Sequence, residues 1–261
     1  MRFHLILEVN KQAFGDLLPI NYQYEQSALI YKILSQGGES YATWLHDNGF
    51  VLGNGKRFKL FTFSPLKIEK RQILRAEGLI KILSDTVEWQ ITFLPERSTE
   101  QFIKGLFVNQ QFEIGDKQSV VRFNVRQVEV VPSPVYTDEM TFRTMSPLCL
   151  RCCRNDGSVQ YISPSDLRAA TALRAGLISR YKAYYKKPFA EDFDFSFTLL
   201  NEPKAKLMKI KAGTAQETLV KGYKCDFKIK APAELMKMMY EGGIGEQCVI
   251  GFGCLTEKKD R

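Results

Sequence analysis

The sequence predicts an α+β fold made of two tandem ferredoxin-like (βαββαβ) domains with a cleft between them. The chain has 261 residues, which is long for one domain and suits two domains of about 130 residues each. The predicted elements follow the order strand, helix, strands, helix, strand, and this order occurs twice. Pro132-Ser133-Pro134 forms a stiff linker between the two runs, so we expect domains at 1–134 and 138–261.

In the first half, an alternating apolar segment at 2–9 predicts a strand, and apolar residues at helical spacing predict a helix over 23–36. Gly37-Gly38 should end that helix, and a second short helical turn is expected at 41–46. The remaining elements are three strand-like segments, one helix and a closing strand, at 58–66, 68–74, 87–94, 98–107 and 120–131.

The second half repeats this order of elements without repeating the sequence. Its patterns predict a strand, a long helix, three strands, a helix and a final strand, at 142–153, 164–187, 193–200, 207–210, 223–229, 232–240 and 248–255.

Composition restricts the class of protein. The N-terminal apolar run is too short for a signal peptide, and no stretch approaches eighteen uncharged apolar residues, so we expect a cytoplasmic protein without a membrane segment. The six cysteines do not resemble a secreted disulfide framework. The net charge is +8, and residues 138–261 hold 21 Lys or Arg against 15 Asp or Glu. This half is therefore the expected polyanion surface.

The two histidines differ in setting. His4 lies within the first strand and is interpreted as an ordinary strand side chain. His46 ends a short amphipathic turn, WLHDNG, just before a flexible Gly/Asn stretch and the basic cluster GNGKRFKLF. A histidine at the edge of a loop is a plausible acid or base, so His46 is the candidate for proton transfer.

Tyr31 and the basic cluster are two further candidates. Tyr31 leaves the apolar stripe of its helix, either as an amphipathic border residue or as a functional phenol. Lys56, Arg57 and Lys59 form either a solvated basic edge or a phosphate contact. A tyrosine, a histidine and a lysine suffice to cut RNA without a metal, because the 2′-hydroxyl must lose a proton, the 5′-oxygen must gain one and the phosphorane needs positive charge.

Two other basic surfaces could hold RNA. The end of the long helix combines cations with tyrosines, which suits unpaired RNA, although cations there also complement the helix dipole. Its basic residues are Arg174, Arg180, Lys182, Lys186 and Lys187. The second surface is a predicted hairpin, in which one face carries Lys204 and Lys206 and another carries Lys209 and Lys211. We favour this hairpin as an RNA contact.

A glycine-rich segment follows the last helix. Its glycines are Gly242, Gly243, Gly245, Gly251 and Gly253. They form either a helix end with a bulged strand or a backbone surface for RNA, and the two are compatible. The segment lacks the Gly-Lys-Ser/Thr ending of a nucleotide-hydrolysing loop. Cys149 and Cys152 have metal-knuckle spacing, but in a strand they point to opposite faces and no second pair accompanies them, so we expect no metal site.

These segments together resemble one family. LIYKIL around Tyr31, TWLH ending in His46, KLFTFSPL from Lys59 and the tail GGIGEQCVIGFGCL are similar to the CRISPR-associated endoribonucleases of the RAMP superfamily, which process precursor CRISPR RNA. The resemblance spans the chain, from RFHLILEV and NYQYEQSALIY through MSPL to the basic hairpin KAKLMKIKAG. The glycine-rich tail is its most specific element.

The resemblance implies two ferredoxin-like domains across a cleft and metal-free cutting at the edge of a CRISPR repeat. The products would be a 2′,3′-cyclic phosphate and a 5′-hydroxyl. Tyr31, His46 and Lys59 match the family's catalytic positions in order, although Lys56 or Arg57 could take the place of Lys59, because the loop before it is longer than in compact members. No cofactor is implied.

Repeat RNA is the implied partner. The sequence leaves open whether other effector-complex subunits or a second copy of the chain also bind. It also leaves open the repeat's sequence and shape. The alternative hypothesis is a catalytically inactive RNA-binding subunit of such a complex, and the presence of His46 and Lys59 favours the enzyme. A tandem RRM-like binder is less favoured, because neither half shows the aromatic RNP signature.

Overall fold

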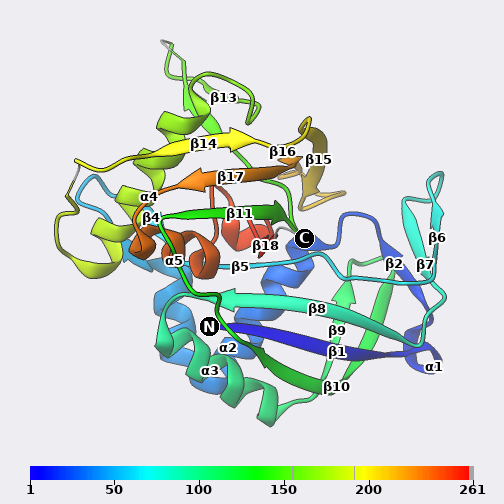
Figure 1. Cartoon of the computed structure of the whole chain (residues 1–261). Coiled ribbons are helices and arrows are strands. Elements are labelled where there is room, and N and C mark those ends of the chain that lie inside the picture. The colour runs from blue at the N-terminus through cyan, green and yellow to red at the C-terminus, as the bar shows by residue number, and fades with distance from the viewer. Residues whose placement is uncertain (155, 191, 259–261) are drawn as a thin grey trace.

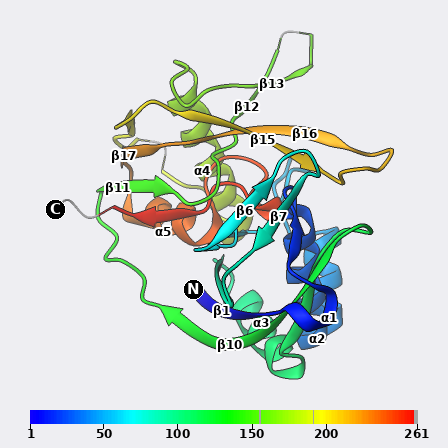
Figure 2. The same ribbon diagram turned by 90° about the vertical axis from the view of Figure 1, so that its right-hand side faces the viewer.

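In the computed structural model, which describes residues 1–154, 156–190 and 192–258, the chain forms two main antiparallel sheets, one in each half. Figures 1 and 2 show the two halves one above the other. The predicted α+β class with two tandem ferredoxin-like domains is confirmed. None of the described helices has the length and apolar character needed to span a membrane.

The N-terminal sheet has the strand order β5-β8-β1-β10-β9, and all neighbours run antiparallel. Along the chain, its main elements follow the βαββαβ order, with β9 as an additional edge strand. The elements are β1 (Arg2–Asn10), α2 (Gln23–Asp47), β5 (Phe61–Phe63), β8 (Thr86–Phe93), α3 (Glu96–Val108), β9 (Gln111–Gly115) and β10 (Val120–Val131).

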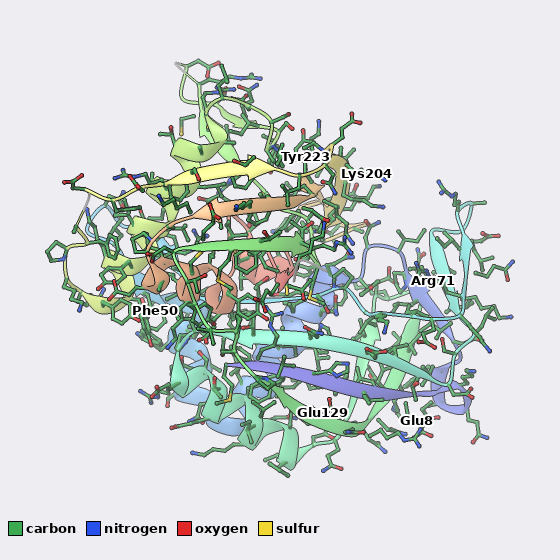
Figure 3. All side chains as sticks on the ribbon, viewed as in Figure 1. Glu8, Phe50, Arg71, Glu129, Lys204 and Tyr223 are labelled. Carbon is green, nitrogen blue, oxygen red and sulfur yellow. The ribbon has the colours of Figure 1, made fainter. Side chains whose placement is uncertain are left out.

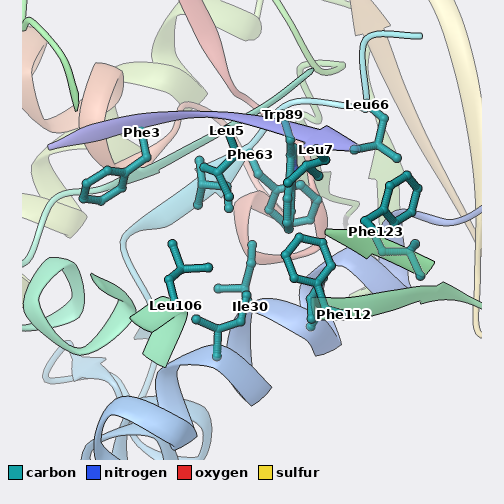
Figure 4. Close-up of a cluster of buried hydrophobic side chains, with 14 of the residues drawn as sticks. Phe3, Leu5, Leu7, Ile30, Phe63, Leu66, Trp89, Leu106, Phe112 and Phe123 are labelled. Carbon is teal, nitrogen blue, oxygen red and sulfur yellow. The ribbon is translucent and has the colours of Figure 1, made fainter. Parts of the chain in front are cut away.

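A large apolar core joins this sheet to its helices. Alternation along β1 puts Phe3, Leu5 and Leu7 on the buried face. Figure 4 shows these side chains facing Ile30 of α2 and Leu106 of α3. Each buried apolar side chain of this size stabilises the fold by about 1.5–3 kcal/mol. The core therefore fixes the position of α2, which carries two of the candidate catalytic residues.

The helix α2 is two helical segments joined at a bend. Gly38 has a φ of −179° and a ψ of 96°, which are not helical values. The sequence prediction of a helix, a break at Gly37-Gly38 and a second helical turn is therefore confirmed, although the second segment continues to Asp47.

At Gly37 the bend packs against the backbone of α3 so closely that only glycine fits, whereas Gly38 faces the movable side chain of Gln101. A Cβ on Gly37 would lie 1.9 Å from the main-chain oxygen of Gln101, and a Cβ on Gly38 would lie 2.3 Å from Oε1 of the same residue. The approach is just as close when measured from α3, because a Cβ on Gly105 would lie 1.8 Å from the main-chain oxygen of Ile33 in α2. The two helices therefore meet backbone to backbone at the bend.

The C-terminal sheet has the strand order β14-β17-β11-β18 and again follows the βαββαβ order along the chain. Its core also includes Phe58, Leu60 and Leu94 of the first half, so the halves share apolar contacts. The elements are β11 (Glu139–Thr144), α4 (Ala169–Tyr185), β14 (Ser196–Leu199), β17 (Asp226–Lys230), α5 (Ala233–Gly242) and β18 (Leu255–Glu257).

The remaining helices and strands are short and lie outside the two main sheets. They are α1 (Lys11–Phe14), β2 (Leu17–Pro19), β3 (Phe50–Val51), β4 (Arg57–Phe58), β6 (Arg71–Leu74), β7 (Leu79–Ile82), β12 (Arg151–Cys153), β13 (Val159–Tyr161), β15 (Lys204–Ile210), β16 (Thr218–Lys224) and the 3₁₀ helix η1 (Cys248–Ile250). The hairpin β15–β16 projects from the upper half above β6 and β7 of the lower half (Figure 2). A cleft of about 500 Å³ lies between these hairpins.

Two predicted strands differ from the structure. The predicted final strand at 248–255 is wrong, because this segment begins with η1 and the strand starts only at Leu255. Gly251 and Gly253 have φ values of 87° and 68°, which an extended strand cannot contain. The strand predicted at 142–153 ends at Thr144 and resumes as β12, because Pro147 between them has no N–H for a ladder.

The segment between β10 and β11 contains the predicted linker. Residues 132–138 form neither helix nor strand. The exact limits of the two domains, 1–134 and 138–261, stay a prediction.

The bend in α2 generates the first prediction. Gly37→Ala should lower the free energy of unfolding by about 1–3 kcal/mol, because the new methyl group overlaps the Gln101 backbone. Urea unfolding measures the change. Gly53→Ala is the control, since a Cβ there meets nothing within 4 Å and should change stability by about 0.5 kcal/mol at most. Equal stability of the two variants would contradict the close approach.

Candidate active site

The bend in α2 brings Tyr31 and His46 together. Their ring centroids are 5.1 Å apart and the rings meet edge to face, at 82°. In a straight helix, fifteen residues would separate them by about 22 Å along the axis. Tyr31 also packs edge-on against Phe61 of β5, at 5.6 Å. One candidate residue therefore comes from each segment of α2, and both lie near the sheet.

Lys59 reaches the same place from the following hairpin. A turn at Gly49, with a φ of 61°, reverses the chain after α2. A Cβ on Gly49 would lie 2.5 Å from the Phe58 oxygen and 2.9 Å from Cδ of Lys59, so glycine is needed for the return. The Lys59 ammonium donates a hydrogen bond to the main-chain oxygen of His46. The structure thus brings Tyr31, His46 and Lys59 together, and their catalytic roles stay a prediction.

The imidazole of His46 is held by a residue that the sequence argument missed. Nδ1 of His46 lies 2.8 Å from Oδ1 of Asp47, and both side chains are more than half exposed. A carboxylate is an acceptor only, so Nδ1 carries the hydrogen, and no hydrogen bond of Nε2 is found among the described residues. Arg57 donates to the main-chain oxygen of Asp47 at 2.6 Å. The only signal in the sequence was a carboxylate adjacent to the histidine.

Burial changes the titration of the other two groups. It raises the pKa of the Tyr31 phenol, and Tyr41 nearby adds to this effect, so the phenol keeps its proton at neutral pH. Burial also lowers the pKa of Lys59 to about 8, with a contribution from the Arg57 charge that Asp47 partly opposes. Lys59 is therefore charged at neutral pH and neutral in alkaline solution.

A pocket of about 250 Å³ adjoins Lys59, lined in part by Lys56, Arg57 and Arg151. Glu246 lies in this pocket, 2.8 Å from the Lys56 ammonium and 3.4 Å from the Arg151 guanidinium. Burial opposes ionisation of Glu246, but the charges of Arg180, Lys56 and Arg151 outweigh it and lower its pKa. Sequence reasoning missed Arg151 and Glu246.

The glycine-rich loop is buried beside this pocket. Its four predicted RNA-binding glycines, Gly243, Gly245, Gly251 and Gly253, all have positive φ and are all buried. The amide of Gly251 donates to the oxygen of Cys248, and that of Gly253 donates to the oxygen of Pro147. These contacts support the interpretation of the glycine-rich loop as a tight turn. Direct contact between this loop and RNA stays a prediction.

Arg180 holds the same loop from α4. It is 4% exposed, and its guanidinium donates to the main-chain oxygens of Gly245 and Gly176. This burial favours a role in positioning the loop, while the predicted RNA contact of Arg180 is untested. Lys182 lines a shallow hollow elsewhere, together with Lys186 and Lys187.

The basic hairpin lies on another side of the molecule. Figure 3 shows Lys204 and Arg71 at the far side from Phe50, which follows His46 in the chain. Lys206 lines the 500 Å³ cleft with Lys67, Arg71 and Lys224. Lys209 pairs with Glu217, and Lys211 hydrogen-bonds Gln216. None of the three candidate catalytic residues lines this cleft.

Both halves of the chain match models of known families. Residues 17–129 match the model described as "CRISPR-associated protein Cas6, N-terminal", and residues 131–257 match "CRISPR associated protein Cas6, C-terminal".

Individual relatives match over almost the whole chain. The chain is 28% identical to "CRISPR-associated endoribonuclease Cas6 1" of Methanocaldococcus jannaschii, over 100% of this chain and 94% of that protein. It is 30% identical to "CRISPR-associated endoribonuclease Cas6" of Pyrococcus furiosus, over 97% and 88%. A solved structure titled "An RAMP protein binding different RNA substrates" superposes with a TM-score of 0.79 at 26% identity, over 99% of this chain and 100% of that one.

The glycine-rich loop generates the second prediction. A Cβ on Gly253 would lie 1.9 Å from the Ile244 oxygen, and the φ of 68° adds strain. Gly213, at the tip of the exposed hairpin, has a φ of 70° but nothing within 4 Å of its Cβ. Both alanine variants suffer the backbone strain, so Gly253→Ala should lose about 1–3 kcal/mol more stability than Gly213→Ala. Thermal unfolding compares them, and equal losses would show that the loop is not tightly packed.

Proposed function

The chain belongs to the Cas6 family of CRISPR-associated proteins, and we propose that it is an endoribonuclease that cuts precursor CRISPR RNA within the repeats. The relatives from M. jannaschii and P. furiosus, which are named CRISPR-associated endoribonucleases, match the chain almost end to end. The observation that carries the proposal is the meeting of Tyr31, His46 and Lys59 at the bend of α2.

The proposed reaction uses the RNA's own 2′-hydroxyl and needs no metal ion. Nε2 of His46 removes the proton of the 2′-hydroxyl, and the resulting oxygen attacks the adjacent phosphorus. The bond from phosphorus to the 5′-oxygen breaks, and that oxygen takes a proton from a water molecule, which the protonated His46 then replenishes. The products are a 2′,3′-cyclic phosphate and a 5′-hydroxyl. A histidine suits this role because its free imidazole accepts a proton near neutral pH.

The other two side chains serve the developing charges. The Tyr31 phenol keeps its proton at neutral pH and so acts as a hydrogen-bond donor toward the scissile group. The Lys59 ammonium supplies positive charge to the phosphorane, whose negative charge rises as the bond forms. Lys56 and Arg57 lie in the adjoining pocket and would hold the flanking phosphates.

RNA binding away from the cut is assigned to the cleft and the basic hairpin. Lys206, Arg71 and Lys224 line a cleft that both halves of the chain form, and Lys204 lies beside it on the same strand. Contacts to phosphates give affinity that falls with salt concentration. We place the reaction in the cytoplasm of a prokaryote, where precursor CRISPR RNA is made.

The third prediction concerns His46. His46→Ala should slow single-turnover cleavage of the cognate repeat RNA by about 10²–10⁴-fold, because the base is lost. Affinity should change little, since the side chain is 67% exposed and lies apart from the cleft. His4→Ala is the matched control, because the His4 imidazole hydrogen-bonds only to Glu88 and Glu129 among the described residues.

An unchanged cleavage rate in His46→Ala would remove His46 from the mechanism. A wild-type protein that binds repeat RNA tightly but never cuts it would favour the non-catalytic subunit instead. Affinity is measured on a repeat with a 2′-deoxy sugar before the cut, so that binding and cleavage are separated.

The fourth prediction concerns pH. Because the pKa of Lys59 is lowered to about 8, its charge is present below that pH and is lost above it. The value of kcat/KM, which reports the free enzyme, should therefore fall on the alkaline side with a midpoint near pH 8. Lys59→Arg stays charged and should move that fall to higher pH. An identical alkaline fall in both proteins would assign it to another group.

A further inference from the structure

An aromatic hollow lies beside the candidate active site. It has a volume of about 420 Å³, and its walls come from the second segment of α2, from β3, from the start of α3 and from the end of α4. The lining side chains are Ser40, Tyr41, Trp44, Phe50, Pro95, Glu96, Arg97 and Tyr184. We propose that this hollow binds one unpaired guanine base of the RNA, next to the cut; this rests on the proposed function.

The walls suit a flat aromatic ligand. Trp44 and Tyr184 each meet the ring of Phe50 edge-on, at 5.3 and 5.0 Å between centroids. Trp44 is 37% exposed, although a tryptophan in an apolar cluster of this kind would normally be covered. Nucleobases stack on exposed aromatic rings, and each stacked base adds a substantial share of binding energy. The exposed face of Trp44 is therefore a surface for stacking.

The charges around the hollow fit RNA better than an apolar peptide. Arg97 lies over the Tyr41 ring at 4.9 Å, on one rim. On the other side of β3, a second hollow is lined by Lys182, Lys186 and Lys187. The Lys187 ammonium also lies 5.5 Å from the centre of the Tyr185 ring. Cations interleaved with aromatic rings are typical of surfaces that follow single-stranded RNA.

The location links the hollow to the cut. Trp44 and His46 lie on the same short segment of α2, two residues apart, so their side chains leave opposite sides of the helix. Phe50 follows directly after the Gly49 turn that returns the chain toward Lys59. An RNA strand held at His46 and Lys59 would reach the hollow by passing round the end of α2.

Glu96 gives the hollow a preference among bases. It is exposed at the start of α3, and no ion pair of Glu96 is found among the described residues. A carboxylate can only accept hydrogen bonds when ionised. Guanine presents two neighbouring N–H donors, at N1 and N2, on one edge, and so can pair with both oxygens. Uracil offers a single N–H between two oxygens, which a carboxylate repels.

Tryptophan fluorescence tests the proposal directly, because Trp89, the second of the chain's two tryptophans, is fully buried. The probes are the RNA heptamers U7 and U3GU3. In the wild type, U3GU3 should quench the emission of Trp44 and bind about tenfold more tightly than U7. Trp44→Ala removes the fluorescent probe, so its binding is followed by the anisotropy of dye-labelled RNA, and its affinity for U3GU3 should fall by about tenfold. Phe107→Ala, which removes an aromatic ring that is 77% exposed on α3, is the control and should match the wild type.

Glu96→Gln separates base choice from stacking. This variant should bind U7 at least as tightly as the wild type, because the repulsion between the carboxylate and the uracil oxygens is gone. It should reduce the preference for U3GU3 to about twofold or less, since an amide presents one acceptor in place of two. A preference that survives in Glu96→Gln would overturn the guanine assignment.

The remaining outcomes separate this inference from the proposed function. If the same preparation cuts repeat RNA but neither heptamer quenches Trp44, the hollow is not a base site, and the enzyme assignment stands. If Trp44→Ala keeps full RNA affinity and instead loses a protein partner, the occupant is a protein and the inference is overturned. If the wild type neither binds nor cuts repeat RNA, the proposed function itself fails.

Discussion

The close approach of α2 to α3 at Gly37-Gly38 is the constraint on which the candidate site depends. Tyr31 and His46 are fifteen residues apart, and they meet only because the chain bends between them. The bend leaves no room for a Cβ against Gln101, and Gly105 removes the corresponding obstacle from α3. The apolar core beneath then holds the first segment of α2 against the sheet. The packing between α2 and α3 thus determines whether the rings of Tyr31 and His46 lie close enough to act on one RNA phosphate.

Electrostatics around the bend follow from partial burial. The Tyr31 phenol and the Lys59 ammonium both lose water, which keeps the phenol neutral and lowers the pKa of the ammonium. The imidazole of His46 stays exposed, with Asp47 on one nitrogen. Tyr31 thus stays a hydrogen-bond donor, Lys59 carries a charge that it loses in mildly alkaline solution, and His46 offers an exposed imidazole. This division of roles matches the proposed reaction, in which one proton leaves, one arrives and negative charge develops between them.

Much of the fold could be predicted from the sequence, because apolar periodicity and Gly-Gly breaks are local signals. The break in α2 at Gly37-Gly38 followed from such a signal, whereas the grouping of Lys59 with His46 was implied by the family resemblance. The strand predicted at 248–255 is wrong because glycines with left-handed backbone angles form a buried loop there. The apolar residues of this loop look like those of a buried strand in the sequence. Arg151 and Glu246 were missed because they meet only in three dimensions. Asp47 was missed although it is adjacent to His46 in the chain, because adjacency alone does not show that the two side chains form a hydrogen bond. Arg180 looked like a surface cation, yet it is buried under the glycine-rich loop, and no local pattern distinguishes the two cases.

The central claim is that the RNA's own 2′-hydroxyl, assisted by these three side chains, breaks the phosphodiester. The most direct measurement is incubation of the protein with its repeat RNA in EDTA, followed by analysis of the ends of the fragments. The account predicts one cut that leaves a 2′,3′-cyclic phosphate and a 5′-hydroxyl, and no cut when the sugar before the scissile phosphate is 2′-deoxy. Fragments with 5′-phosphate ends, or cleavage that persists on the 2′-deoxy substrate, would contradict it.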